Sequence, residues 1–86
     1  MSLSELASPL RITGFRQVYR ELQTGQVRKV FFAKDADPKR ISPVLELAQE
    51  QGIDIEEAPS MIMLGRACAI SRSASVAALR STERKL

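Results

Sequence analysis

Histidine is absent from the 86 residues of this chain, and cysteine occurs once, as Cys68. A lone cysteine rules out an internal disulfide, and the lack of histidine leaves no second soft ligand for a metal site. The same inventory excludes nucleophiles of the Ser/His and Cys/His type, which need an imidazole base. We therefore expect a protein that is not an enzyme and that holds neither a metal nor a cofactor.

Long apolar runs are also lacking. No stretch approaches the roughly 20 residues that a membrane-spanning helix needs. The opening residues MSLSELASPLRI lack the basic start and the long apolar run of a secretory signal. We expect a protein that stays in the cytoplasm and has no membrane partner.

The composition is that of a small folded domain. Hydrophobic residues make up 44% of the chain and charged residues 27%, a balance typical of globular rather than disordered proteins. At this length one core takes up nearly the whole chain, and no repeat, linker or low-complexity segment divides it. We expect one domain over residues 1–86, monomeric, with fraying confined to residues 1–10 and 81–86.

Charge is unevenly distributed along the chain, although the formal net charge is only +3. Residues 1–34 hold six basic and two acidic side chains, and residues 58–86 hold five basic and one acidic. Between them, residues 35–57 hold two basic and seven acidic side chains. If the fold brings the two basic ends together, one face of the molecule is positive, as in a nucleic-acid-binding protein.

Apolar spacing predicts a first helix shortly after Thr13, which can cap it. Gly25 ends this helix in a left-handed turn. The positions that follow the i, i+3, i+4, i+7 spacing of a buried stripe are Phe15, Val18, Tyr19 and Leu22. An unbroken apolar run at residues 30–33 then predicts a central strand covered on both faces.

A second helix is predicted from Asp37, which can cap it, and Pro38, which suits its first position. Because a Ser-Pro pair repeats the start signal five residues later, we expect a loose first turn and a regular helix from Val44. Asp35 and Asp37 follow a strand and so could instead hold a magnesium ion or accept a phosphoryl group. No neighbouring acidic cluster is evident, however, and capping accounts for Asp37.

The rest of the chain predicts two strands and one helix. Apolar and acidic residues alternate over residues 53–56, which indicates a strand with one solvent-exposed face or edge. The apolar residues 76–79 indicate a last strand. Between them, Ser60 caps a mostly apolar helix in which Cys68 is expected to pack as a small hydrophobe. Strand, helix and strand units with short connections imply an α/β fold with helices on both faces of a small sheet.

The stretch GFRQVYR at residues 14–20 carries the polar side of the first helix. Arg16, Gln17 and Arg20 lie three and four residues apart, opposite the apolar stripe. One interpretation is a solvated helix face. The other is a surface for nucleic acid, because arginine bonds phosphate or guanine edges and glutamine reads base edges. Gly14 would let a backbone approach the positive helix end, and Arg66 could extend toward the same surface.

Four motifs together resemble a known family. They are GFRQVYR at residues 14–20, AKDADP at 33–38, Pro59-Ser60, and LGRACAI at 64–70. In their order and spacing they resemble the kink-turn-binding ribosomal proteins of the large-subunit seven-A-e type, especially the small bacterial members of the YbxF and YlxQ kind. The resemblance implies a three-layer α/β/α sandwich around a small mixed sheet of about four strands.

The resemblance also implies a partner. Members bind kink-turn RNA, a bent duplex with a bulge and tandem sheared G·A pairs, so we expect a ribonucleoprotein role with ribosomal RNA or an untranslated leader. In the family, the start of the first helix enters the widened groove at the G·A pairs, and a loop near the third helix and the following loop pack on the bulged nucleotides. Onto these motifs fall the expected RNA-binding residues Gly14, Arg16, Gln17, Arg20, Lys34, Pro59, Ser60, Arg66, Ile70, Ser71 and Arg72.

The chain departs from the family at some of these positions. Many members have Asn or Lys where it has Arg16, Glu where it has Gln17, and Lys where it has Arg20 and Arg66. The family usually has Gly where Ala69 stands. An alternative hypothesis is therefore a protein-interaction module that keeps the fold but has lost RNA binding, and that uses its acidic middle or its apolar third helix against a partner.

Overall fold

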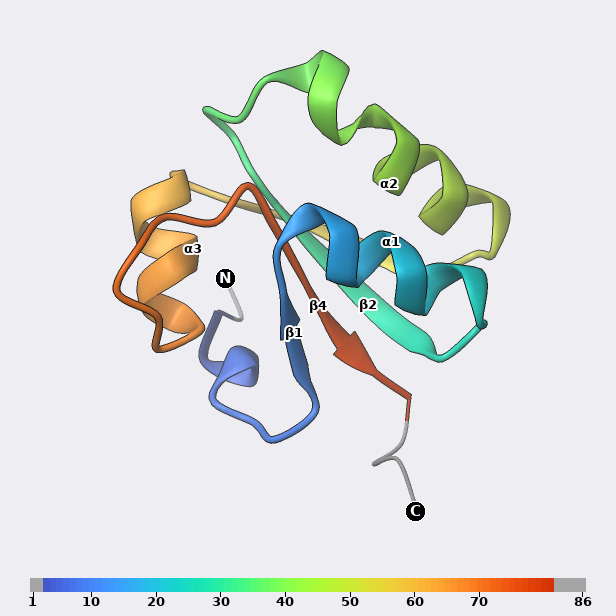
Figure 1. Ribbon diagram of the computed structural model, residues 1–86, viewed down its shortest axis with the longest axis horizontal. Coiled ribbons are helices and arrows are strands. Elements are labelled where there is room, and N and C mark those ends of the chain that lie inside the picture. The colour runs from blue at the N-terminus through green and yellow to red at the C-terminus, as the bar shows by residue number, and fades with distance from the viewer. Residues whose placement is uncertain (1–2, 82–86) are drawn as a thin grey trace.

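The computed structural model describes residues 3–81, which form four strands and three α-helices after a short 3-10 helix, η1 (Figure 1). In chain order the elements are η1 (Leu3–Leu6), β1 (Arg11–Thr13), α1 (Phe15–Gln23), β2 (Val27–Ala33), α2 (Pro38–Glu50), β3 (Asp54–Ala58), α3 (Met61–Ala67) and β4 (Val76–Arg80).

The strands form one mixed sheet in the order β1-β4-β2-β3. β4 pairs antiparallel with both β1 and β2, and β2 pairs parallel with β3. It follows that β1, β2 and β3 point the same way and that their carboxyl ends meet at one edge of the sheet. Each of these strands leads into a helix, so α1, α2 and α3 all begin at this edge, which we call the carboxyl edge.

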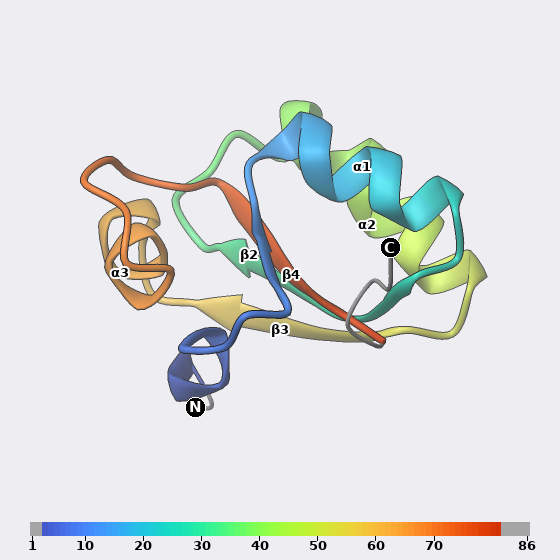
Figure 2. The same cartoon turned by 60° about the horizontal axis from the view of Figure 1, so that its bottom comes forward.

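Helices cover both sides of the sheet. α1 and α2 lie side by side over one face, while α3 and η1 lie on the other side (Figure 2). The three-layer α/β/α sandwich around a four-stranded mixed sheet is therefore confirmed. The pairing of β1 with β4 also brings together segments from the two basic ends of the chain.

The core lies where the apolar pattern places it. β2 is an inner strand, and its Val30 and Phe31 are fully buried, which confirms the predicted central strand. Val18 and Leu22 of α1 and Leu64 of α3 pack from opposite sides and are also fully buried. Each such side chain contributes about 1.5–3 kcal/mol through removal from water.

The start of α1 differs from the prediction. Thr13 does not cap the helix, because it is the last residue of β1, a strand that the apolar spacing did not indicate. Gly14 takes the N-cap position instead, with φ of 90° and no side-chain hydrogen bond. With three residues, of which only Ile12 is buried, β1 is too short for alternation to reveal it.

α2 begins as predicted. The Oδ1 atom of Asp37 accepts a hydrogen bond from the backbone N–H of Lys39 at 3.0 Å, and Pro38 opens the helix. The expected loose first turn is wrong, because the helix runs unbroken from Pro38. Pro43 lacks the N–H that would bond the Lys39 carbonyl, and the hydroxyl of Ser42 donates to that carbonyl at 3.4 Å instead.

The first residues of the described chain are tied to the fold, although fraying was expected there. Leu6 is fully buried. The Nζ atom of Lys29 lies 2.9 Å from Oε1 of Glu5 and 3.0 Å from Oε1 of Glu56. Hydrogen bonds to these two carboxylates raise the pKa of Lys29. At the other end, the expected fraying falls mainly on residues 82–86, which lie outside the described residues.

Candidate nucleic-acid interface

Segments far apart in the sequence meet at the carboxyl edge. The backbone N–H of Gly14, at the start of α1, donates to the carbonyl of Val76 at 3.2 Å. The segment before β4 is attached to α3, because the N–H of Ala74 donates to the carbonyl of Met61 at 3.0 Å. The start of α1 and residues 68–75, which we call the α3–β4 loop, therefore lie next to each other.

A hollow of about 330 Å³ opens at this edge. Its lining comes from the starts of all three helices and from the α3–β4 loop, and consists of Phe15, Asp37, Arg40, Ile41, Met61, Ser73 and Ser75. The ring of Phe15 is stacked on that of Tyr19, with 5.9 Å between centroids, which fixes it at the rim. The hollow thus combines apolar walls with hydroxyls and one charged group of each sign.

The sequence did not identify this lining as a set. Its members are scattered over residues 15–75 and share no motif. The signal that could have found them is the repeated strand-to-helix connection, because helices that follow parallel strands begin at one edge of the sheet.

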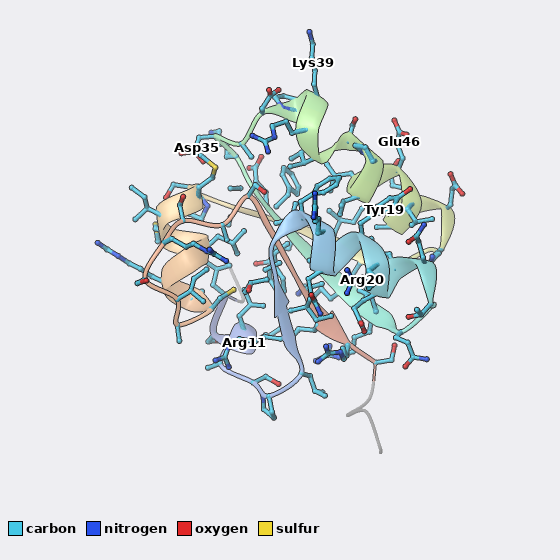
Figure 3. The ribbon with its side chains drawn as sticks, in the orientation of Figure 1. Arg11, Tyr19, Arg20, Asp35, Lys39 and Glu46 are labelled. Atoms are coloured by element: carbon cyan, nitrogen blue, oxygen red, sulfur yellow. The ribbon has the colours of Figure 1, made fainter. Side chains whose placement is uncertain are left out.

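α1 buries one side and exposes the other, as its sequence predicts. Val18 is fully buried, whereas Arg16, Gln17 and Arg20 are exposed. In Figure 3, Tyr19 lies on the side of α1 toward α2, and Arg20 lies away from α2. Within residues 3–81, none of the ion pairs involves Arg16 or Arg20, so both guanidinium groups are available to a ligand.

The N-terminus of α1 lacks a cap that the other helices have. Asp37 caps α2, and the Oγ atom of Ser60 caps α3 by accepting from the N–H of Met63 at 3.1 Å, which confirms both predictions. Oδ1 of Asp35 accepts from the first N–H of α3 at 2.8 Å. Among the α-helices of residues 3–81, only α1 has no side-chain cap. Its first N–H groups and positive dipole end are therefore left to bind an acceptor.

The α3–β4 loop begins with a tight helix end. The N–H of Ala69 donates to the carbonyl of Arg66 at 3.0 Å, and the N–H of Ile70 donates to that of Gly65 at 3.2 Å, a Schellman turn. Such a turn needs a left-handed residue, and Ala69 takes φ of 60°. A side chain at Gly65 would overlap the carbonyl oxygen of Arg72, so glycine there lets the loop pack on α3.

The remaining expected RNA-binding residues lie on α3 or on the segments directly before and after it, and none of them lines the hollow. Ser71 and Arg72 are exposed on the α3–β4 loop just before Ser73, which lines the hollow. Ile70 is half-buried against the core. Exposed Pro59 and half-buried Ser60 precede α3, and Arg66 is exposed on α3.

Lys34 is placed differently from the others. It is exposed after β2 and lines a second hollow, between β2 and α2, rather than the first. Its backbone N–H donates to the carbonyl of Ala58 at 2.9 Å. The structure therefore does not group Lys34 with Arg16 and Gln17.

Two basic side chains from the basic segments 1–34 and 58–86 form ion pairs within the protein. The Nε atom of Arg80 lies 3.1 Å from Oε1 of Glu21, a carboxylate on α1 that is buried. Lys29 is held between two carboxylates, as described above. The sequence did not single out Glu21, because its position next to the apolar stripe resembles that of a solvated residue. The charge pattern of the sequence therefore counted two basic side chains, Lys29 and Arg80, that are paired with carboxylates inside the protein.

Cys68 is placed as a packing residue rather than as a reactive thiol. The side chain is fully buried, and burial raises the pKa of its thiol, which confirms the predicted packing role. Across residues 3–81, no three histidine, cysteine, aspartate or glutamate side chains gather closely enough to hold a metal ion.

Comparison with known proteins identifies the family of this chain and supports its fold. A sequence model of the ribosomal protein L7Ae/L30e/S12e/Gadd45 family matches residues 10–85, nearly the whole chain. The chain belongs to this family. The RNA-binding protein YbxF of Geobacillus stearothermophilus is 34% identical to it over 68 residues, which are 79% of this chain and 83% of YbxF. A protein of Bacillus pumilus named as RNA-binding is 41% identical over the same shares of the two chains.

Solved structures give the same result for this L7Ae-family chain. A 15.5 kD RNA-binding protein of Giardia lamblia superposes with a TM-score of 0.78 at 29% identity, over 94% of this chain and 69% of that one. A Bacillus halodurans protein of unknown function gives a TM-score of 0.80 at 26% identity, over 93% and 84%. The resemblance to the family and to its small bacterial members is confirmed. None of the helices within residues 3–81 has the length and apolar character to span a membrane.

Proposed function

We propose that this L7Ae-family protein binds structured RNA of the kink-turn type and carries out no catalysis. The observation that carries the proposal is the junction between the uncapped start of α1 and the α3–β4 loop, made by the 3.2 Å hydrogen bond from Gly14 to Val76. The names of the Bacillus pumilus and Giardia lamblia proteins, which include RNA binding, support RNA as the partner.

α1 supplies the contacts to the helical part of the RNA. Its uncapped N–H groups attract phosphate or base acceptors, and Arg16 and Arg20 add two guanidinium groups. The amide of Gln17 both donates and accepts, so it can pair with a base edge. Sheared G·A pairs present such edges in a widened groove, whereas the major groove of a regular RNA duplex is too narrow for side chains to read.

The hollow can receive an unstacked nucleotide, which a kink-turn has at its bulge and a straight duplex lacks. At about 330 Å³ it is at the small end of ligand pockets, a size that suits one unstacked base. Phe15, Ile41 and Met61 provide apolar surface, while Asp37 and Ser73 provide hydrogen-bonding groups. We infer that the bulged nucleotide of the kink-turn enters the hollow while α1 contacts the G·A pairs.

The experiment compares two fluorescently labelled RNAs of equal length, a kink-turn and a straight duplex, by anisotropy at low and moderate salt. Rising salt weakens the binding of both RNAs to a similar degree, because counterion release does not depend on the shape of the RNA. We expect the kink-turn to bind more tightly at both salt concentrations, with one protein per RNA. Equal affinities would mean that the basic surface is merely electrostatic, and no binding of either RNA would favour the protein-interaction hypothesis.

The biological setting that we propose is a ribonucleoprotein in the cytoplasm, with the kink-turn located in ribosomal RNA or in an untranslated leader. Both sources offer the same bulge and G·A pairs to the same residues. Sedimentation of the protein with ribosomal particles from cells, followed by identification of cross-linked RNA, distinguishes them. Cross-links confined to messenger leaders would contradict a ribosomal role.

A further inference from the structure

The second hollow has a volume of about 290 Å³ and lies between α2 and the end of β2. We call it the α2 groove. Its apolar lining comes from Phe32 and Ala33 of β2 and from Pro38, Ile41 and Leu45 of α2. Phe32 and Leu45 are only half-buried. The groove therefore leaves apolar surface open to solvent, and this is the kind of surface that a binding partner covers.

The groove follows the axis of α2. Pro38, Ser42, Leu45 and Gln49 line it and succeed one another at intervals of three and four residues, so they form a single stripe on the helix. A helix rises 1.5 Å per residue, which gives this stripe a length of about 16 Å. An extended peptide covers that length with about five residues.

Acidic side chains outnumber basic ones around the groove. Glu46 lines it, and exposed Glu57 of β3 pairs with Phe32 across the two strands. Glu50 follows Glu46 by one turn of α2 but lies outside the lining, and exposed Lys39 precedes Glu46 by two turns. Within residues 3–81, none of the ion pairs involves Glu46, Glu50 or Glu57. The one basic residue of the lining is Lys34, at the end nearest β2. Near Glu46 and Glu57 the charge of the face opposes an RNA backbone and favours a basic group.

We propose that the α2 groove docks a short basic segment of another protein, with a large apolar side chain seated on Phe32 and Leu45 and a lysine or arginine beside Glu46. The charge of the face selects a basic partner, and the apolar floor selects a side chain such as phenylalanine or leucine. At about 290 Å³ the groove is just below the size range of pockets for free small ligands, so one or two side chains fit it better than a cofactor.

The two hollows adjoin but do not coincide. Ile41 lines both, with Asp37 and Arg40 in the first and Pro38 and Ser42 in the second. A peptide in the α2 groove would therefore lie beside the proposed RNA site without occupying it. Basic segments are typical of proteins that themselves contact RNA, so such a partner could bind this protein and the same RNA together.

The test uses a short fluorescein-labelled peptide with lysines on both sides of a central Phe-Leu pair, added to the whole protein without RNA. A second peptide with Ser-Gly in place of Phe-Leu controls for charge alone. We expect the first peptide to bind at least tenfold more tightly than the second. We also expect its amide chemical-shift changes in the protein to centre on Ala33, Ala36 and Gln49, which line the groove.

Two charge reversals on the same helix localise the contact. Glu46→Lys should weaken binding of the Phe-Leu peptide about tenfold, because Glu46 lines the groove. Glu50→Lys is the matched control, with the same change of charge on an exposed residue outside the lining, and should weaken binding less than threefold. Glu46→Gln keeps the test informative if Glu46→Lys alters the amide spectrum of the free protein.

Several outcomes would overturn the proposal. They are equal losses for Glu46→Lys and Glu50→Lys, equal binding of the two peptides, shift changes centred on α1, and concentration-dependent dimers that bury the groove against a second copy. Shift changes in the groove on addition of single-stranded RNA would assign it to RNA instead. Because no kink-turn RNA is present in the peptide experiment, its result is independent of the function proposed above.

Discussion

The N–H of Gly14 and the carbonyl of Val76 are joined by a hydrogen bond of 3.2 Å, although three α-helices and two strands separate the two residues in sequence. The bond holds the start of α1 against the first residue of β4, directly after the α3–β4 loop. Gly14 has φ of 90°, and nothing lies within 4 Å of the place where a Cβ would stand. Glycine is therefore required for its conformation, and it leaves the first turn of α1 uncovered.

The two exposed arginines of α1 give the first prediction. Arg16→Ala should weaken kink-turn binding by about 1–3 kcal/mol, as for one good base or phosphate contact. Arg20→Ala should weaken it similarly and reduce the salt slope by about one unit. Unfolding temperatures should not change, since both side chains are exposed and neither joins an ion pair within residues 3–81. Anisotropy over a salt series measures the affinities.

The matched control is Arg28→Ala. Arg28 is also exposed, but it lies near the start of β2, at the end of the sheet opposite the carboxyl edge. It should change affinity little at moderate salt. Equal losses in all three variants would show that only the net charge matters.

Ala69 gives a prediction about stability. A left-handed conformation costs a residue with a Cβ about 1–2 kcal/mol, and glycine avoids this cost but loses about 0.4–1 kcal/mol through the greater freedom of its unfolded chain. Ala69→Gly should therefore raise the free energy of unfolding by about 0.5–1 kcal/mol, measured in urea. Ala67→Gly, inside α3, is the control and should lower it by a similar amount. Destabilisation by both would contradict the strain assigned to Ala69.

Cys68 gives a prediction about pH. Burial raises the pKa of its thiol above the ordinary 9.0, so the unfolded chain ionises at a lower pH than the folded protein. The associated stabilisation is present below about pH 9 and is lost as pH rises through the folded pKa. Cys68→Ala should remove this part of the alkaline loss and should lower stability at neutral pH through a small cavity, without changing RNA affinity.

A variant of Lys29 provides the control for the pH measurement on Cys68. Its pKa is also raised, from an ordinary 10.5, by Glu5 and Glu56, so the stability that it contributes is lost at a higher pH. Unfolding in urea at a series of alkaline pH values should therefore show a first decline that Cys68→Ala abolishes and Lys29→Met retains. Rapid labelling of Cys68 in the native protein would contradict its burial.

Local signals predicted most of the fold. Asp37 followed by Pro38 marked the start of α2, and Ser60 marked the start of α3, because capping depends on a few neighbouring residues. The run of residues 30–33 marked the central strand for a similar reason. The wrong assignment of Thr13 arose because a cap and the end of a short strand place the same residue type before a helix.

The candidate site was predicted only in part. The resemblance placed Gly14, Arg16 and Gln17 on the surface, but the hollow depends on how three strand ends meet, and no local pattern contains that information. Glu21 was missed because its partner Arg80 lies 59 residues away in the sequence. Long-range pairs of this kind become visible only when the sheet order is known.

The most direct test of RNA recognition is a double-mutant cycle between the protein and the RNA. Kink-turn affinity is measured for the natural protein and for Arg16→Ala, each with the sheared G·A pairs intact and with these pairs replaced by Watson–Crick pairs. If Arg16 contacts the G·A pairs, each single change weakens binding, and the two together cost about 1–2 kcal/mol less than their sum. Strictly additive losses, or equal affinity of the natural protein for both RNAs, would contradict the account.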